Sequence, residues 1–215
     1  MKYILLDTET DGLDPPTVVE LAYAVFESSD AIADVLRADI RVRRFGCDHK
    51  MAAEAKAVHL ICDVDIADKP LFKPDELPAC DVIVAHNVSY DAIAIGRVGV
   101  PSIDTLAIAR LLWPAFRSHK LGALIFELCQ DEREAKGMVG RSHSAWDYVK
   151  ALAWLIVQMP AAAQALDYRL NDWDDLFALS EIARVPRVMP FGKHAGESID
   201  TVPREYLEWL LAQEN

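Results

Sequence analysis

Two carboxylates near the start of the chain have the types and the spacing of a metal site. Asp7 and Glu9 follow a short apolar run at residues 2–6 that is typical of a strand. Side chains two positions apart on a strand point to the same side, so these carboxylates lie next to each other. Neighbouring like charges repel unless a cation lies between them, and Mg²⁺ is commonly bound by one or two carboxylates. The pair predicts a divalent-metal site, although solvated strand ends often have the same pattern.

Two later segments add polar groups that strengthen this prediction. The segment HNVSYD, residues 86–91, directly follows an apolar run at residues 82–85. The segment HSAWD, residues 143–147, opens a stretch with helical periodicity. The order along the chain is therefore an acid pair, then an asparagine with an aspartate, then a histidine with an aspartate. Together these groups predict one composite acidic site.

With these motifs, the chain resembles the DEDD-type 3′–5′ exonucleases, in the branch that uses a histidine. The resemblance extends nearly from end to end and includes DTETDGL at 7–13, HNVSYD at 86–91, ARLLWP at 109–114 and FGKHAGESID at 191–200. It implies a 3′–5′ exodeoxyribonuclease that hydrolyses phosphodiester bonds and releases nucleoside 5′-monophosphates. It also implies two divalent metal ions, Mg²⁺ with Mn²⁺ as a substitute, which activate water and relieve charge on the phosphate.

The resemblance assigns roles to the composite site. The family's four metal-binding acids correspond to Asp7, Glu9, Asp91 and Asp147, and its general base corresponds to His143. A histidine suits that role because its unperturbed pKa is near neutrality. The family usually has four residues between this histidine and the last aspartate, whereas three separate His143 from Asp147, and position 142 is a serine. On a helix, side chains at i and i+4 share a face, so the shorter spacing is workable.

Four further residues are expected to contact the substrate. By resemblance, the backbone at Thr10 holds the terminal 3′-hydroxyl and Leu13 wedges against the last base, although Leu13 also suits a core contact. Asn87 is expected to order the loop of the second motif. Tyr90 either stacks on the substrate or packs against the protein. The hydroxyl of Tyr148 is a less favoured neighbour of the metal ions.

Hydrophobic periodicity predicts the elements that position these residues. We expect strands at residues 2–6, 18–26, 39–44, 82–85 and 102–104, and helices at 52–58, 89–98, 105–112, 121–129, 145–159, 174–184 and 203–211. The resemblance implies an α/β, RNase H-like fold with a mixed five-stranded sheet flanked by helices and the acid pair on the central strand. Residues 1–160 are expected to form the exonuclease domain, and residues 161–215 a small α+β appendage of a helix, a hairpin or turn, and a helix.

Composition restricts the partners. The formal net charge of −12 argues against a basic surface that wraps a duplex, and it favours an enzyme that holds a few nucleotides through metal ions. Single-stranded DNA and frayed duplex 3′ ends are the expected substrates. No apolar run is long enough to cross a membrane. The four cysteines are scattered, which predicts reduced thiols of a cytoplasmic protein and neither a disulfide framework nor a zinc site.

Two alternatives stay open. One is an exoribonuclease with the same chemistry, because details of the pocket decide whether a 2′-hydroxyl is accepted. The other is a nucleic-acid-binding module without catalysis, for which the shortened spacing before Asp147 is the sequence support. The sequence does not identify protein partners.

Overall fold

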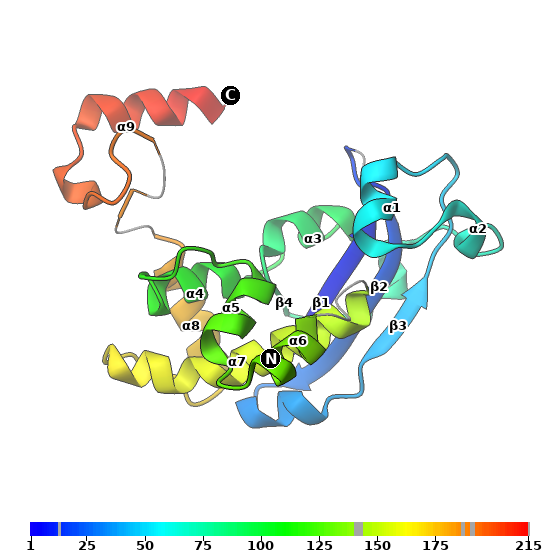
Figure 1. Ribbon diagram of the computed structural model, residues 1–215, viewed down its shortest axis with the longest axis horizontal. Coiled ribbons are helices and arrows are strands. Elements are labelled where there is room, and N and C mark those ends of the chain that lie inside the picture. The colour runs from blue at the N-terminus through cyan, green and yellow to red at the C-terminus, as the bar shows by residue number, and fades with distance from the viewer. Residues whose placement is uncertain (13, 140–143, 186–187, 190–191, 215) are drawn as a thin grey trace.

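A five-stranded mixed sheet forms the centre of the computed structural model, which describes residues 1–12, 14–139, 144–185, 188–189 and 192–214 (Figure 1). The strands are β1 (Lys2–Thr10), β2 (Val18–Glu27), β3 (Arg41–Arg44), β4 (Val82–Ala85) and β5 (Ser102–Asp104). Their order is β3-β2-β1-β4-β5, so β1 is central. The first three strands pair antiparallel, and β1, β4 and β5 pair parallel. This confirms the predicted sheet and the central position of the strand that contains the acid pair.

Helices cover both faces of the sheet, which explains why β1 is apolar on both sides. Tyr3 and Leu5 of β1 pack into a core with the helices on one face. Those helices are α4 (Thr105–Leu112), α5 (Leu121–Leu128), α7 (Ala145–Ala165) and α8 (Trp173–Ala183). Ile4 and Leu6 point to the other face, where they join a second core with Val88 of α3 (Val88–Ala94). The alternation of β1 therefore divides its side chains between α7 and α3.

Shorter elements complete the connections. These are η1 (Ile32–Arg37), α1 (Ala53–His59), α2 (Asp63–Ile66), η2 (Pro74–Glu76) and α6 (Glu132–Val139). The sequence analysis did not predict η1, α2, η2 or α6. Within the described ranges, no helix combines the length and the apolar character needed to cross a bilayer.

The expected boundary after residue 160 falls inside α7, which continues to Ala165. The next helix, α8, also packs on the sheet, because the fully buried Trp173 stacks on Tyr3 and Phe26 at centroid distances of 5.5 and 4.9 Å. The hydroxyl of Tyr3 donates to Asp174 of the same helix. We therefore propose that the sheet domain extends through α8 and that the appendage begins after it.

The end of the chain is separate from the sheet in Figure 1. It contains an isolated bridge between Val188 and Ser198, the short helix η3 (Ile199–Thr201), α9 (Arg204–Leu211) and η4 (Ala212–Glu214). Tyr206 of α9 contacts His194 with ring centroids 4.6 Å apart. This part agrees with the predicted turn followed by a helix.

Candidate active site

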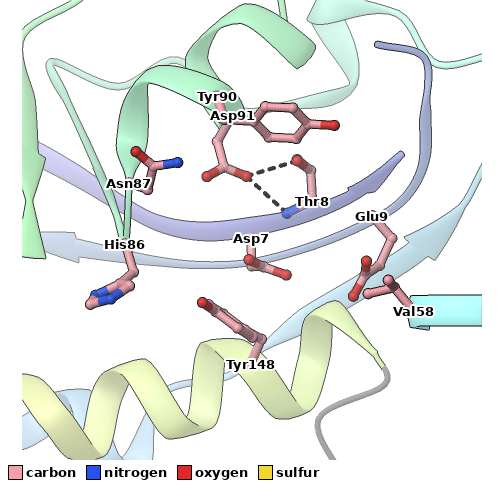
Figure 2. A pocket seen from close by; sticks show the side chains of 9 residues that line it. All are labelled: Asp7, Thr8, Glu9, Val58, His86, Asn87, Tyr90, Asp91 and Tyr148. Atoms are coloured by element: carbon pink, nitrogen blue, oxygen red, sulfur yellow. Dashed lines mark hydrogen bonds between the residues drawn. The ribbon is translucent and has the colours of Figure 1, made fainter. Parts of the chain in front are cut away.

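β1 presents Asp7 and Glu9 on the sheet face that α7 covers. Tyr3 and Leu5 occupy the same side of the strand, and their packing under α7 fixes which way the odd-numbered positions point. Both carboxylates line a pocket of about 220 Å³ at the end of β1 (Figure 2). The predicted pairing of the two acids on one side of a strand is therefore present.

Asp91 reaches the same pocket because β4 is short. β4 pairs with β1 between Tyr3 and Leu5, so the second half of β1 extends past the end of β4. The Asp91 carboxylate, from the first turn of α3, occupies this position. Its Oδ1 accepts from the Thr8 backbone N–H at 3.1 Å and from the Thr8 hydroxyl at 2.7 Å. A buried side chain thus replaces the missing strand partner and is held beside the acid pair.

The turn into α3 depends on Asn87, the helix N-cap. Its backbone adopts a left-handed conformation with φ 74°, which asparagine tolerates better than most residues. Its N–H donates to the Asp104 carboxylate at 3.0 Å, and its side chain lines the pocket. The prediction that Asn87 orders this loop is consistent with its position.

The three carboxylates strongly perturb one another. Removal from water, followed by the charges of Asp91, Glu9 and Glu20, holds the pKa of Asp7 well above its usual range. Burial, then Glu20 and Asp91, raises the pKa of Glu9 to about 7. Burial raises the pKa of Asp91 to about 7, although its hydrogen bonds from Thr8 oppose the shift. Without a cation, these crowded carboxylates resist ionisation. A divalent cation would remove the repulsion between them, so the group is suited to bind one.

The start of α7 presents Tyr148 to this pocket. Tyr148 lines it together with Asp7, Glu9 and Asp91, and Figure 2 shows its hydroxyl between Asp7 and His86. Burial and then the charge of Asp7 raise the pKa of this phenol, so it stays neutral at physiological pH. Tyr148 therefore supplies a hydrogen-bonding hydroxyl to the pocket and no negative charge.

Asp147 is not among the residues that line the acidic pocket. It borders a second cavity with Trp146 and Lys150. Its Oδ2 accepts from the hydroxyl of Ser144, the N-cap of α7, at 3.0 Å, and its N–H donates to the same hydroxyl at 3.3 Å. Consecutive helical residues differ by about 100° in direction, so Asp147 and Tyr148 cannot both face the sheet.

The geometry thus does not support the prediction that Asp147 joins the other three acids. That prediction followed the family pattern and placed His143 and Asp147 on one helix face, without comparing Asp147 with the buried stripe of α7. Counted forward from His143, the usual spacing of the family reaches position 148. The buried stripe of α7 gives the same answer, because Tyr148 lies four positions before the fully buried Leu152.

Glu20 is a residue of this site that the sequence analysis missed. It pairs directly with Glu9 across β1 and β2, and it is 3% exposed. One carboxylate oxygen accepts from the Ala145 N–H at 3.0 Å, and the other accepts from Arg44 at 2.8 Å. Glu20 therefore ties the N-terminus of α7 to the sheet. The signal was a single acid inside the apolar strand VVELAYAVF.

The remaining predicted residues divide into two groups. Thr10 and Tyr90 join their hydroxyls in a hydrogen bond at the end of β1, and Tyr90 lines the pocket. The carbonyl of Thr10 accepts from His59 at 3.1 Å. The predicted base wedge, Leu13, and the predicted general base, His143, lie outside the described residues.

Comparison with known proteins places this pocket in context. The chain is 25% identical over 216 residues to exodeoxyribonuclease 10 of Escherichia coli strain K12, across 96% of this chain and 89% of that protein. It is 28% identical over 190 residues to the PolC-type DNA polymerase III of Bacillus subtilis strain 168, which covers 77% of this chain and 12% of the polymerase. The chain is therefore homologous to exodeoxyribonuclease 10 over nearly its whole length.

Solved structures support the same RNase H-like fold. Exonuclease X in complex with 5′ overhanging duplex DNA matches with a TM-score of 0.56 and 20% identity, over 83% of this chain and 99% of that one. Escherichia coli exonuclease I in complex with a dT13 oligonucleotide matches with a TM-score of 0.58 and 15% identity, over 77% of this chain and 42% of that one. The similarity to these exonucleases implies the use of divalent metal ions, and the acidic pocket has carboxylates that could bind them.

A family model matches a different part of the chain. Residues 177–214 match the putative quorum-sensing-regulated virulence factor family. This match begins in α8 and includes α9. It lies outside the acidic pocket.

Proposed function

We propose that this protein is a metal-dependent 3′–5′ exodeoxyribonuclease that releases nucleoside 5′-monophosphates. The observation that supports this most strongly is the convergence of Asp7, Glu9 and Asp91 on one pocket at the end of the central strand. The homology to an exodeoxyribonuclease covers 96% of the chain and supports the same activity. A cytoplasmic location, expected from the sequence, is part of this proposal.

The three carboxylates are the proposed ligands of divalent ions, Mg²⁺ with Mn²⁺ as a substitute. Such ions activate water and relieve negative charge on a scissile phosphate. The family pattern predicts four acids and two ions. In this chain, Tyr148 of α7 lines the pocket where the fourth acid is expected. We propose that one ion binds to the free protein and that a second binds when a DNA phosphate adds oxygen ligands.

The other residues of the pocket suit a 3′ end. Tyr90 and the exposed side chain of Asn87 line the pocket, and the Thr10 hydroxyl is hydrogen-bonded to that of Tyr90. We propose that they contact the terminal nucleotide of a single strand or a frayed duplex. His143 remains the predicted general base. The solved relatives that contain an oligonucleotide and an overhanging duplex are compatible with such substrates.

Tyr148 also favours a second candidate function, which is binding of 3′ ends with little or no hydrolysis. A neutral phenol in place of a carboxylate lowers the negative charge that holds metal ions. It leaves a hydroxyl that can donate to a phosphate oxygen. This candidate uses the same pocket and differs in whether the phosphodiester bond breaks.

A single set of assays separates these functions. DNA and RNA oligonucleotides of the same sequence, labelled at the 5′ end, would be incubated with Mg²⁺, Mn²⁺ or EDTA, and their binding would be followed in parallel by fluorescence anisotropy. We expect progressive shortening of DNA with either metal and none with EDTA. An Asp7→Asn protein purified identically controls for contaminating nucleases. Tight 3′-end binding without shortening would support the second candidate, and faster shortening of RNA would support an exoribonuclease.

A further inference from the structure

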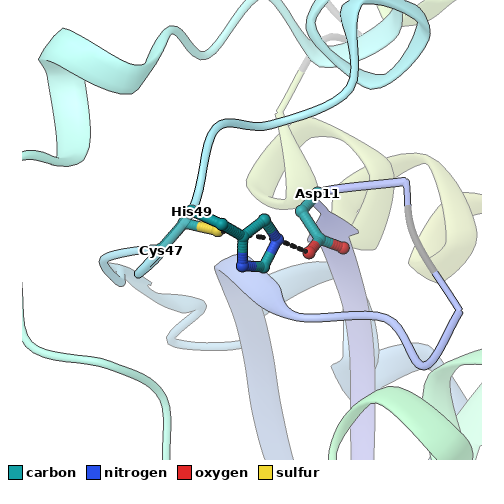
Figure 3. Close-up of side chains that lie close together, drawn as sticks. All are labelled: Asp11, Cys47 and His49. Carbon is teal, nitrogen blue, oxygen red and sulfur yellow. Dashed lines mark hydrogen bonds and ion pairs between the residues drawn. The ribbon is translucent and has the colours of Figure 1, made fainter.

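A second cluster of metal-binding side chains lies next to the acidic pocket but is chemically different. Asp11 follows β1, and Cys47 and His49 lie in the loop after β3 (Figure 3). Their donor atoms all lie within 4.8 Å of one another. The His49 Nε2 is 2.7 Å from the Asp11 Oδ2 and 3.3 Å from the Cys47 Sγ. One thiol, one imidazole and one carboxylate therefore converge from two loops.

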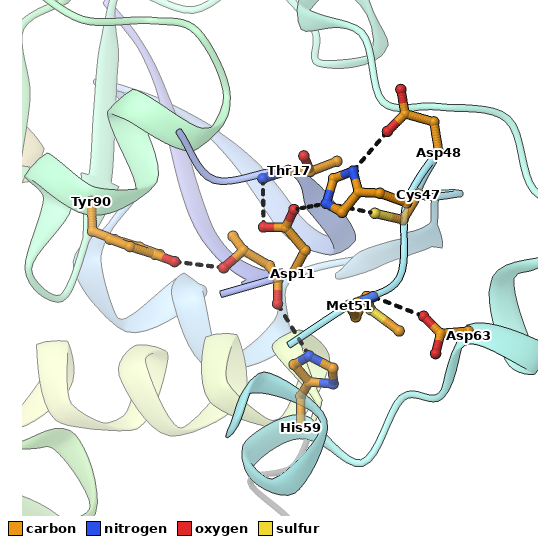
Figure 4. A network of polar contacts seen from close by, with 10 residues as sticks. Asp11, Thr17, Cys47, Asp48, Met51, His59, Asp63 and Tyr90 are labelled. Carbon is orange, nitrogen blue, oxygen red and sulfur yellow. Dashed lines mark hydrogen bonds and ion pairs between the residues drawn. The ribbon is translucent and has the colours of Figure 1, made fainter. Parts of the chain in front are cut away.

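The groups around this cluster already orient its donors (Figure 4). His49 Nδ1 is 2.8 Å from the Asp48 carboxylate, which leaves Nε2 to face Asp11 and Cys47. Asp11 is fully buried, and its Oδ1 accepts from the Thr17 N–H at 2.9 Å. Histidines that bind metals commonly donate their other ring N–H to a carboxylate, and carboxylates that bind metals are themselves hydrogen-bonded. An ion pair between Asp11 and His49 alone does not account for the third donor.

We propose that Asp11, Cys47 and His49 bind Zn²⁺ or a similar borderline divalent ion, with water as a fourth ligand. Mixed sulfur, nitrogen and oxygen donors suit zinc, whereas Mg²⁺ prefers oxygen alone. Zinc bond lengths of about 2.0–2.3 Å place tetrahedral ligand atoms about 3.4–3.6 Å apart. The 2.7 Å contact between His49 and Asp11 must therefore lengthen by less than about 1 Å. The His49 side chain is 38% exposed, so solvent borders it and leaves space for a shift of this size.

The position of the site indicates a structural role for the ion. Its ligands would connect the segment after β1 to the loop that leads into α1. The Asp11 carbonyl already accepts from the Ala52 N–H at 3.1 Å, immediately before α1 begins. Val58 of α1 lines the acidic pocket, and His59 supports Thr10. The ion would therefore fix one side of the proposed substrate site without taking part in the chemistry.

The sequence analysis did not expect a zinc site because the cysteines lack the usual paired spacing. One residue separates Cys47 from His49, and Asp11 lies 36 residues before Cys47 in the chain. These segments come together because β2 pairs with β1 on one side and with β3 on the other.

Cobalt substitution tests the proposal independently of nuclease activity. Protein stripped with EDTA under reducing conditions would be titrated with Co²⁺, because cobalt bound to a thiolate has an intense near-ultraviolet charge-transfer band. We expect this band to reach the intensity of one thiolate-bound Co²⁺ per chain in the wild type and in Asp7→Asn, and to be lost in Cys47→Ser. Cys62→Ser, which removes an exposed thiol at the start of α2, is the matched control and should keep the band.

A stability measurement covers the case in which Cys47→Ser does not fold. In the Asp7→Asn background, Zn²⁺ should raise the melting temperature, and the added substitution His49→Gln on the exposed loop should abolish that rise. Absence of the cobalt band in the wild type, or a zinc effect that persists in His49→Gln, would overturn the proposal. The cluster would then be an ion pair beside a free thiol. Neither readout depends on whether the acidic pocket cleaves DNA.

Discussion

The two sides of the acidic pocket differ in how the fold determines which side chains they present. On the sheet side, strand alternation orients Asp7 and Glu9, and two hydrogen bonds from Thr8 hold Asp91. On the helix side, the register of α7 places Tyr148 in the pocket and Asp147 beside Ser144, the N-cap of the helix. The carboxylates that are held by the sheet converge, whereas the carboxylate on the helix does not.

This difference shows that a motif position alone does not bring a carboxylate to the acidic pocket. A strand position is fixed by a period of two, and the pairing of β1 with β2 enforces it at Asp7 and Glu9. A helix position changes direction by about 100° with each residue, so a spacing that is one residue shorter exchanges one side chain for another. The following predictions test whether the sheet side alone holds the metal.

The largest effect is expected for Asp7→Asn. Turnover should fall on the order of 10⁴-fold or more, the scale of losing a central catalytic group. The metal-free variant should nevertheless melt at a higher temperature than the wild type, because the substitution removes a charge that is crowded by Asp91 and Glu9. Single-turnover cleavage and thermal melting in EDTA check the two expectations. Unchanged turnover would exclude this pocket as the site of hydrolysis.

Tyr148→Asp is expected to have the opposite effect on metal binding. A carboxylate at this position would face Asp7 and raise Mg²⁺ affinity at least about 10-fold, the scale on which supporting groups alter metal affinity. Turnover should also rise if His143 is the base, because the usual spacing to an acid is then restored. Isothermal titration calorimetry measures the affinity. Tyr148→Phe is the matched control, and equal affinities in the two variants would show that position 148 does not face the metal.

The sequence predicted the sheet side of the site well because its signals are local. Alternation within one strand placed Asp7 and Glu9, and a motif at the end of the next parallel strand placed Asp91. The five strands were also predicted, with small differences in their ends.

The missed features depend on contacts between distant segments. Glu20 accepts a hydrogen bond from the backbone of Ala145, which is 125 residues later in the chain. The cluster around Asp11 includes two residues from the loop after β3. The buried stripe of α7 indicates which residues face the sheet, whereas the family pattern favoured Asp147, whose role as a metal ligand remains a prediction. The proposed extension of the sheet domain through α8 also depends on distant contacts, because only the packed structure shows Trp173 against Tyr3 and Phe26.

The pH dependence of stability should reveal the crowded acids directly. Glu9 and Asp91 have pKa values of about 7 in the folded protein, against ordinary values of 4.5 and 3.8. The folded state therefore binds more protons between these limits, and its stability decreases as the pH rises from about 4 to about 7. Chemical denaturation in EDTA should give a lower unfolding free energy at pH 8 than at pH 5.

Two comparisons make this measurement specific. Mg²⁺ should restore stability at pH 8 more than at pH 5, because it binds the ionised carboxylates. Glu9→Gln should make the pH dependence shallower, since it removes one of the groups with a raised pKa. If the unfolding free energy of Glu9→Gln changed with pH as steeply as that of the wild type, Glu9 would not be a source of the pH dependence.

The smallest effect is expected for Asp147→Ala, which completes the contrast between the two sides. It removes the Oδ2 that accepts from Ser144 and a negative charge in the first turn of α7. The unfolding free energy should fall by about 0.5–1 kcal/mol, as for other losses at helix N-termini. Ser144→Ala should cost a similar amount, and the double variant should cost less than the sum because both residues share one interaction. Mg²⁺ affinity should stay at the wild-type value in all three proteins. A loss of affinity in Asp147→Ala that approaches the loss in Asp7→Asn would mean that α7 rotates on binding metal and that its aspartate is a ligand after all.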